Sequence, residues 1–235
     1  MRMVSEMKKT WGGVFDDRTI MSIFKLMNNG TIKNLITMAK EGKEARVIVA
    51  EGKEGNVAMK VYAVDAANFK KMMPYLIGDP RFLKIKNDKM SIILAWAKKE
   101  YKNLERAKEA GVHCPRPLAL EKNVLVMEFI GEGIDPAPRL TNCDLDDPEG
   151  VFKALLEDVE KLWTKAKIVH GDLSEFNILM FQETPWMIDF SQSVVQDHPE
   201  SKVFLKRDLK NICSYFKKLG VVCDEEEIYE RLIKK

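Results

Sequence analysis

The segment that decides how this chain folds reads Val169-His170-Gly171-Asp172-Leu173-Ser174-Glu175-Phe176-Asn177-Ile178-Leu179-Met180. It places a carboxylate and a carboxamide five residues apart between apolar runs, and the run Trp186-Met187-Ile188-Asp189-Phe190 soon supplies a second carboxylate. Phosphoryl-transfer enzymes use one Asp to orient the attacking hydroxyl and oxygen ligands to hold magnesium. A single loop Asp is more often a turn residue, but three groups in this order favour catalysis. We therefore predict that Asp172 is the catalytic base and that Asn177 and Asp189 bind the metal.

The composition is that of an ordinary globular protein. With 235 residues, 46% hydrophobic and 31% charged, the chain is long enough for two lobes. Thirty-eight basic and thirty-six acidic residues are too balanced to indicate a nucleic-acid or membrane partner. The four cysteines show no Cys-x-x-Cys spacing, only three histidines are present, and no apolar run approaches eighteen residues. We expect reduced thiols, a cytoplasmic location, and no membrane or DNA partner.

Residues 1–40 are expected to be helical and to pack on the first lobe. Apolar residues recur at helical spacing on both sides of an Asn-Asn-Gly stop: Ile20, Ile23, Phe24, Met27, Leu35 and Met38. A helix-turn-helix that binds nucleic acid is the less favoured alternative, because the exposed face is not strongly basic.

A β-hairpin is predicted from Ala45 to Val64, with its turn at 51–55. Before it, Gly42, Lys43 and Glu44 form a candidate phosphate-covering loop, in which glycine lets backbone N–H groups approach a polyphosphate. An ordinary turn explains a single glycine about equally well.

Lys60 stands in the second strand of this hairpin among residues that would bury it. The run Val57-Ala58-Met59-Lys60 differs by one residue from the Val-Ala-Ile-Lys of protein kinases, whose lysine meets the ATP phosphates and a helix carboxylate. Glu100 is the candidate carboxylate, because it lies on the apolar stripe of a helix predicted from Ser91 to Ala110. The alternative is a Glu on a solvated helix face.

Three further segments complete the chain. The insert at about 65–90 is either a flexible flap or an inert surface loop. The strand Val124–Gly131 is either a buried strand or a hinge whose backbone binds a purine, with Met127 filling the pocket behind it. Only 45 residues follow Phe190, which leaves room for about two helices and no long activation loop.

Together these motifs resemble the RIO family of atypical protein kinases. Within that family they resemble the first subfamily, the Rio1 type, which has archaeal members, more than the second. The resemblance spans about residues 15 to 216. It rests on Gly42-Lys43-Glu44-Ala45, Ala58-Met59-Lys60-Val61-Tyr62, Ile77-Gly78-Asp79-Pro80-Arg81-Phe82, Val124 to Gly131, Pro136-Ala137-Pro138-Arg139-Leu140, His170 to Asn177, Ile188-Asp189-Phe190-Ser191-Gln192-Ser193-Val194 and Asp197-His198-Pro199.

The resemblance implies an α+β, bilobal, reduced protein-kinase-like fold. Its parts would be an N-terminal helical extension (1–40), an N-lobe with an antiparallel sheet, a helix and the insert (41–130), and a small helical C-lobe (131–235).

The resemblance also implies an activity and its cofactors. It implies a serine/threonine kinase or ATPase that uses ATP with magnesium or manganese. Lys60 would hold the phosphates, Glu128 and Ile130 would bind adenine through their backbones, and Asp172 would be the acid/base residue. Asp189 would bind metal with Asn177 and form an aspartyl-phosphate.

The expected partner is the small ribosomal subunit precursor, with its rRNA and ribosomal proteins. Candidate basic clusters for rRNA contact are Lys98-Lys99-Lys102, Lys206-Arg207-Lys210 and Lys217-Lys218, which would otherwise be solvated helix faces.

Two alternatives stay open: a small-molecule phosphotransferase of the aminoglycoside or choline kinase type, and an ATP-switched ribosome-assembly factor. Glu41 and Arg46 replace the family's usual hydroxyl and Asn in the phosphate loop, and Arg46 would lie over the nucleotide or face solvent.

Overall fold

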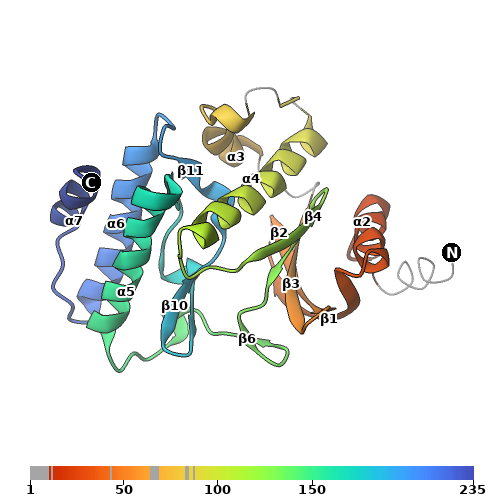
Figure 1. Cartoon of the computed structure of the whole chain (residues 1–235), viewed down its shortest axis with the longest axis horizontal. Helices are drawn as coiled ribbons and strands as arrows, with labels where there is room; N and C mark the ends of the chain where they lie inside the picture. Colours follow the sequence, from red (N-terminus) through yellow and green to blue (C-terminus); the bar gives the residue numbers. More distant parts are fainter. Residues whose placement is uncertain (1–10, 12, 43, 64–68, 83–84, 87) are drawn as a thin grey trace. The chain divides into compact units, whose positions relative to one another are not determined.

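The computed structural model describes residues 11–235 except 12, 43, 64–68, 83–84 and 87. The elements follow one another in the order shown by the colours of Figure 1. They form two compact units, and helix α4 (Lys89–Glu109) contributes to both. The first unit comprises Met1–Phe69, Lys86–Lys98 and Pro117–Pro136, and the second comprises Lys70–Ile85, Lys99–Arg116 and Ala137–Lys235.

A five-stranded sheet forms the centre of the first unit. Its strands are β1 (Ile32–Glu41), β2 (Ala45–Gly52), β3 (Asn56–Tyr62), β4 (Pro117–Glu121) and β5 (Val124–Glu128). The order across the sheet is β1-β2-β3-β5-β4, and every neighbouring pair is antiparallel. The β2–β3 hairpin has the turn that the sequence predicts. Short strands β6 (Gly131–Glu132) and β7 (Asp135–Pro136) follow the sheet.

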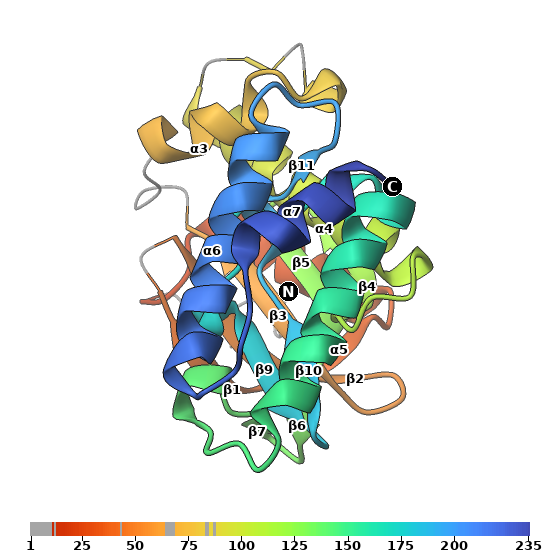
Figure 2. The same cartoon turned by 90° about the vertical axis from the view of Figure 1, so that its left-hand side faces the viewer.

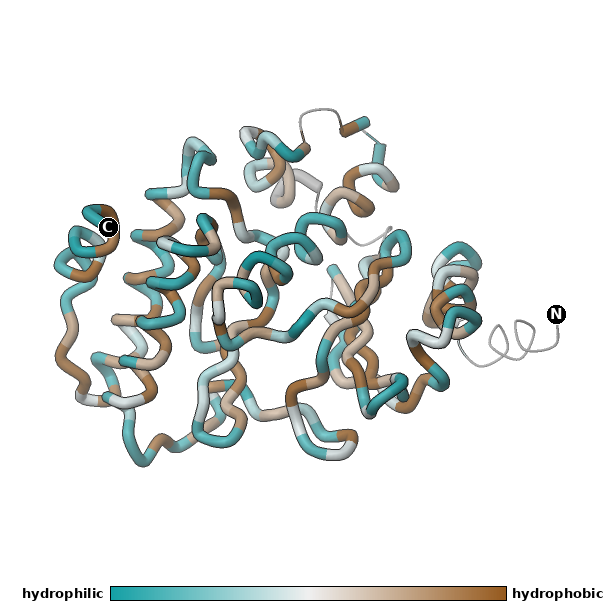
Figure 3. Tube along the Cα trace, viewed as in Figure 1, coloured by the Kyte–Doolittle hydropathy of each residue, from teal (hydrophilic) through white to brown (hydrophobic). Residues whose placement is uncertain are grey.

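Helix α2 (Asp17–Asn28) packs on this sheet and closes the core of the first unit (Figure 1). Asp16 caps it by accepting the Thr19 N–H at 2.7 Å. Brown, apolar stretches alternate with teal, polar ones along the strands in the hydropathy colouring of Figure 3. The fully buried apolar side chains of this core are Ile20, Ile23, Ile32, Ile48, Ala50, Met59, Val124 and Val126. Burial of these side chains is the main driving force for folding of this unit.

The expectation of helix through residue 40 is wrong for its last part. Helix α2 ends at Asn28, and Gly30 (φ +75°) turns the chain into β1. Three register shifts interrupt the pairing of β1 with β2. Each shift is an irregularity of the bulge type, which changes the alternation of sides along a strand. Ile32 is buried in the core and Leu35 packs against the same core three residues later, a spacing that imitates a helix.

Helices dominate the second unit. They are α3 (Phe69–Leu76), the second half of α4, α5 (Pro148–Lys161), α6 (Ser201–Lys218) and α7 (Glu225–Ile233), with a π-helical turn η3 (Leu162–Ala166) extending α5. Helices α5 and α6 run side by side in Figures 1 and 2, and the rings of Phe152 and Phe216 lie 5.0 Å apart. The two helices after Phe190 agree with the sequence analysis.

Short strands and 3-10 turns carry the functional segments of the second unit. Strands β9 (Ile178–Phe181) and β10 (Thr184–Met187) form one antiparallel pair, and β8 (Ile168–Val169) and β11 (Val194–Val195) form another. The 3-10 turns are η1 (Pro80–Phe82), η2 (Leu140–Asn142), η4 (Glu175–Asn177) and η5 (Phe190–Gln192). The predicted α+β class with an antiparallel sheet is confirmed. Among the described residues, no helix is both long and apolar enough to cross a membrane.

The insert predicted at 65–90 contains helix α3 and the turn η1 within its described residues. Its residues 70–85 belong to the second unit rather than to the sheet-bearing first unit. The imidazole Nε2 of His198 hydrogen-bonds the Ile77 carbonyl at 2.8 Å, and the ring of Tyr75 stacks on Phe204 at 5.0 Å. These contacts join the insert to the loop before α6 and to α6 itself.

Candidate active site

Asp172 lies in the loop between β8 and β9, where the sequence predicts a catalytic base. The amide nitrogen of Asn177 donates to both the Asp172 carbonyl (2.8 Å) and Asp172 Oδ2 (3.0 Å). The side-chain amide of Gln192 donates to the same Oδ2 at 3.1 Å. Two neutral donors thus hold the Asp172 carboxylate oxygen Oδ2 in place. Gln192 is a neighbour that the sequence analysis did not single out.

The register of the β9–β10 hairpin explains the spacing between the two predicted metal ligands. Ile178 pairs with Met187, and the Ile188 N–H donates to the Asn177 carbonyl at 2.9 Å. Asp189 is the next residue, so the hairpin brings it close to Asn177. Asp189 has a left-handed backbone (φ 66°, ψ 68°), and its Oδ1 accepts the Ser191 hydroxyl at 2.7 Å. A non-glycine residue in this conformation is strained, which is common at functional sites.

His170 and Gly171 connect the catalytic loop to the segment after Asp189. The backbone N–H of Asp172 donates to His170 Nδ1 at 3.3 Å, so Nε2 carries the proton and faces the Ile188 carbonyl at 3.1 Å. Gly171 has φ +78°, and an added Cβ would lie 2.8 Å from the Gln192 carbonyl oxygen. Only glycine allows this close approach.

Asp208 of α6 holds the backbone of the loop that carries Asp172. Its two carboxylate oxygens accept the N–H groups of Gly171 (2.7 Å) and Leu173 (3.0 Å). Burial raises the pKa of Asp208 to about 7, against the opposing effect of these two N–H donors. The signal was present in the sequence, because Asp208 interrupts the apolar stripe that includes Phe204, Leu205, Leu209 and Ile212.

We expect Asp208→Asn to remove a distinctive pH dependence of stability. Unfolded Asp loses its proton near pH 4, whereas folded Asp208 retains it to about pH 7, so wild-type stability should fall between these values. The free energy of unfolding of the wild type should fall by about 4 kcal/mol over this range. The Asn variant should not show this fall, because its side chain does not titrate. Urea unfolding of both proteins at pH 4.5, 6 and 7.5 measures the difference. A difference in the free energy of unfolding that does not vary with pH would contradict the assignment.

The first unit carries the predicted nucleotide-binding residues. Lys60 is buried in the middle of β3, paired with Val47 and Leu125, and its ammonium lies 5.2 Å from the Tyr62 ring centre. Glu128 ends β5, with Met127 before it, and Ile130 is buried just after it. The positions from 127 to 130 therefore follow one another at the carboxyl end of this inner strand. The hinge interpretation of this strand stays a prediction.

The loop between β1 and β2 holds Gly42 and Glu44, whereas Lys43 lies outside the described residues. A Cβ at Gly42 would lie 2.9 Å from the Ala45 carbonyl oxygen, so the turn requires glycine. The Arg46 guanidinium pairs with the Glu41 carboxylate (3.2 Å) and donates to the Val14 carbonyl (2.9 Å). Both of these contacts lie within the first unit.

Glu100 is fully buried on α4, as the apolar stripe predicts, and the solvated alternative is wrong. Glu100 belongs to the second unit and Lys60 to the first. Their pairing stays a prediction.

The basic clusters proposed from sequence are only partly solvated. Lys99 is fully buried and cannot contact a partner, which corrects its inclusion in the first cluster. Lys206 pairs with Glu226 at 2.9 Å, and Lys217 pairs with Glu225 at 2.7 Å. These acidic partners reduce the positive charge that α6 presents.

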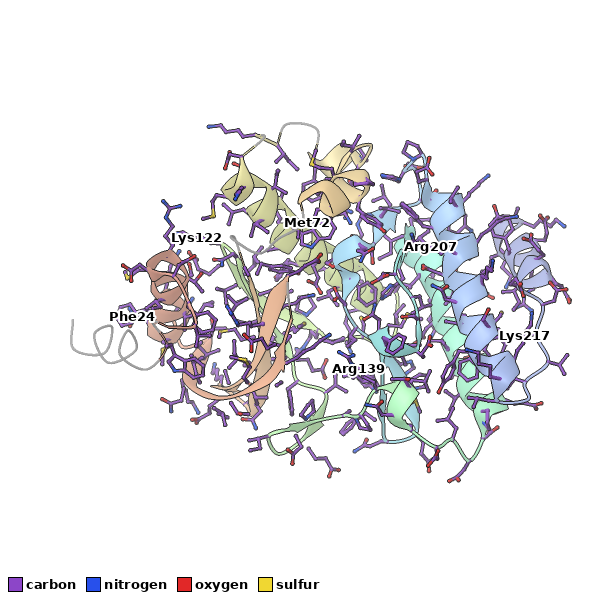
Figure 4. The ribbon with its side chains drawn as sticks, turned by 180° about the vertical axis from the view of Figure 1, so that it is seen from behind. Phe24, Met72, Lys122, Arg139, Arg207 and Lys217 are labelled. Carbon is purple, nitrogen blue, oxygen red and sulfur yellow. The ribbon has the colours of Figure 1, made fainter. Side chains whose placement is uncertain are left out.

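Arg207 has a structural contact as well as an exposed position on α6, where Figure 4 labels it. Its guanidinium donates to the Gly171 carbonyl and, at 3.2 Å, to the Tyr75 hydroxyl. It also lies over the Phe204 ring, 5.0 Å from its centre. Arg207 thus ties α6 to the residue that precedes Asp172.

Comparison with known proteins identifies the family. The family model of the RIO domain matches residues 45–228. This chain belongs to the RIO family. It is 40% identical to the RIO-type serine/threonine-protein kinase Rio1 of Haloferax volcanii over 218 residues, which cover 92% of this chain and 75% of the relative. The Rio1 kinase of Methanocaldococcus jannaschii is 41% identical over 222 residues, covering 94% and 76% of the two chains. The predicted Rio1-type family and RIO kinase class are confirmed.

A solved structure confirms the fold. The Rio2 kinase in an ADP/Mg2+-phosphoaspartate complex from Chaetomium thermophilum matches with a TM-score of 0.71 and 20% identity, covering 92% of this chain and 66% of that one. At this identity the likeness shows the fold alone, and it confirms the expected α+β, kinase-like class. The individual site residues stay predictions.

Proposed function

We propose that this RIO chain transfers the γ-phosphate of ATP to a hydroxyl acceptor, with Asp172 as the base. The observation that carries the proposal is the shared set of hydrogen bonds in which Asn177 and Gln192 hold the Asp172 carboxylate. In the transfer, the acceptor oxygen forms a bond to the γ-phosphorus, the bond from that phosphorus to the leaving oxygen of ADP breaks, and Asp172 takes the hydroxyl proton.

The donor chemistry of Asn177 and Asp189 fits a magnesium ion. Both supply hard oxygen atoms, and magnesium needs only one or two protein oxygens beside phosphate and water. The Asn177 amide nitrogen faces Asp172, so its oxygen is directed away from that carboxylate. A bound magnesium or manganese ion would neutralise charge on the phosphates. The Ser191 hydroxyl keeps Asp189 oriented by donating to Oδ1.

We further propose that the nucleotide is bound by residues of the first unit. Lys60 would contact the phosphates, and the backbones of Glu128 and Ile130 would bind adenine beside Met127. Gly42 and Glu44 would bring backbone N–H groups to the phosphates, together with Lys43. The place of Lys60 in the middle of β3, between β2 and β5 of the same sheet, supports this role.

Replacing Lys60 with alanine should lower ATP turnover by at least about 100-fold, as when one electrostatic contact to a reacting group is lost. Initial rates of phosphate release from ATP measure this effect. Lys53→Ala is the matched control, because Lys53 is exposed at the turn of the same hairpin. Equal rates for the two variants would rule out the role of Lys60 in phosphate binding.

The acceptor is proposed to be a serine or threonine of a protein, as the names of the curated relatives state for those kinases. The alternative acceptor is a small molecule, as for aminoglycoside or choline kinases. Labelled ATP supplied with the chain alone, kanamycin or choline separates the two. Acid-stable phosphoserine on protein supports the proposal, and label on the added small molecule contradicts it.

A further proposal concerns the biological role. On the basis of the family resemblance, we propose that the chain acts in maturation of the small ribosomal subunit in the cytoplasm. An ATP-driven switch would then release the chain from the precursor. Exposed cations on α6 support an rRNA contact, and they are Lys202, Arg207, Lys210 and Lys218. Co-sedimentation with small subunits, with ATP or a non-hydrolysable analogue, tests the role. The switch requires retention with the analogue and release with ATP, and indifference to the nucleotide contradicts it.

A further inference from the structure

The 3-10 turn η5 and the residue after it contact the catalytic machinery through three side chains. The Ser191 hydroxyl donates to Asp189, and the Gln192 amide donates to Asp172. The Ser193 hydroxyl donates to the His170 carbonyl at 2.8 Å. A shift of this turn would therefore move both carboxylates on which the proposed transfer depends.

The opposite side of the turn is held by two buried residues of α4. Asn103 Nδ2 donates to the carbonyls of Phe190 (3.0 Å) and Ser193 (2.8 Å). The Lys99 ammonium donates to the carbonyls of Ser191 (3.0 Å) and Ser193. Lys99 and Asn103 are fully buried and lie one helical turn apart on α4, so they present one donor surface to the turn.

The orientation of the Asn103 amide depends on Arg81 of the insert. Arg81 Nη1 donates to Asn103 Oδ1 at 2.9 Å. A guanidinium has only donors, so the Asn103 oxygen must face it and the amide nitrogen must face the turn. With the amide reversed, its oxygen would oppose two carbonyl oxygens. Arg81 thus selects the one amide orientation that holds Phe190 and Ser193.

Asp79 in turn holds Arg81. Its buried carboxylate accepts Arg81 Nε at 2.9 Å and Nη2 at 2.7 Å, a bidentate arrangement. Its Oδ1 also accepts the Arg81 backbone N–H at 3.0 Å. Burial lowers the pKa of Lys99, the nearby charge of Arg81 reinforces this effect, and the Asp79 carboxylate opposes it. The insert is therefore electrostatically linked to the lysine that holds the turn.

We propose that Asp79 and Arg81 are positioning residues that, through Asn103, hold the Phe190–Ser193 turn and so set the metal-binding orientation of Asp189. This inference rests on the proposed function. The insert then serves catalysis as a fixed support, where the sequence suggested a flexible flap or an inert loop. Residues that support a metal ligand without touching the metal typically change affinity or activity 10- to 100-fold when replaced.

The test compares Arg81→Gln with Arg81→Lys. Lysine keeps a charge for Asp79 but lacks the planar guanidinium that reaches Asp79 and Asn103 together. Arg81→Lys should therefore be more stable than Arg81→Gln while its activity stays low. Removing Arg81 alone leaves a buried carboxylate unpaired and destabilises the fold. The double variant Asp79→Asn, Arg81→Gln removes both charges and keeps the test informative. Lys102→Gln is the matched control, because Lys102 is an exposed cation of α4 that pairs with Glu105 on the same helix.

Two readouts decide the outcome. The magnesium concentration that gives half-maximal ATP turnover should rise about tenfold in Arg81→Lys and in the double variant, with ATP binding in the absence of metal unchanged. Amide exchange at 190–193, including the Ser193 N–H bonded to the Phe190 carbonyl at 3.2 Å, should become faster. Values like those of Lys102→Gln in both readouts would overturn the inference. Absence of turnover in the wild type would instead contradict the proposed function, while faster exchange in the variants would still support the positioning of the turn.

Discussion

Replacing Asp172 with asparagine should lower the rate of γ-phosphate transfer by about 10² to 10⁴-fold, the usual contribution of a positioned general base. Asn177 and Gln192 both donate to the same oxygen, Oδ2. An asparagine oxygen in that place preserves both hydrogen bonds, whereas its amide cannot accept the proton of the attacking hydroxyl. The loss should therefore appear in the rate and leave the affinity for ATP unchanged. Single-turnover transfer from labelled ATP measures the rate.

The matched control for this prediction is Glu175→Gln. It makes the same carboxylate-to-amide change three residues later, in the η4 turn of the same loop. We expect near wild-type turnover for this control and an unchanged melting temperature for both variants. Equal activity of Asp172→Asn and Glu175→Gln would remove Asp172 from the catalytic step.

Replacing Asp189 with asparagine should weaken metal binding and lower turnover by at least about 100-fold, because a neutral amide is a poorer ligand for magnesium than a carboxylate. The Ser191 hydroxyl can still donate to the remaining oxygen, so the turn should persist. Activity measured across a magnesium titration should show a higher half-saturating concentration than in the wild type. The proposed aspartyl-phosphate should also disappear, detected as loss of hydroxylamine-labile label.

Asp197→Asn is the control for Asp189, since Asp197 is exposed eight residues later. It should leave both the magnesium dependence and the labile label unchanged. Hydroxylamine-labile label that persists in Asp189→Asn would place the acyl phosphate on another carboxylate.

Much of the second unit could be predicted because its candidate catalytic residues are close in sequence. Asp172 and Asn177 share one loop, and a single hairpin brings Asp189 to Asn177. Local spacing therefore carries most of the information about how Asp172, Asn177 and Asp189 come together. The buried strand around Lys60 was predictable for a similar reason, since its apolar neighbours come directly before and after it.

The supports of the site could not be predicted from sequence, because they join residues far apart in the chain. Asn103 binds carbonyls 87 and 90 residues later, and its own orientation depends on Arg81, 22 residues earlier. No local periodicity shows such pairs. Bulges likewise gave β1 a three-residue spacing that resembles a helix, so the strand was predicted as the wrong element.

The most direct measurement is the release and transfer of label from γ-labelled ATP by the purified chain as magnesium is varied, with Asp172→Asn in parallel. We expect label to leave ATP only with the metal, to saturate with its concentration, and to be lost in Asp172→Asn. Turnover that is independent of magnesium, or that Asp172→Asn retains in full, would contradict a phosphoryl-transfer site built from Asp172, Asn177 and Asp189.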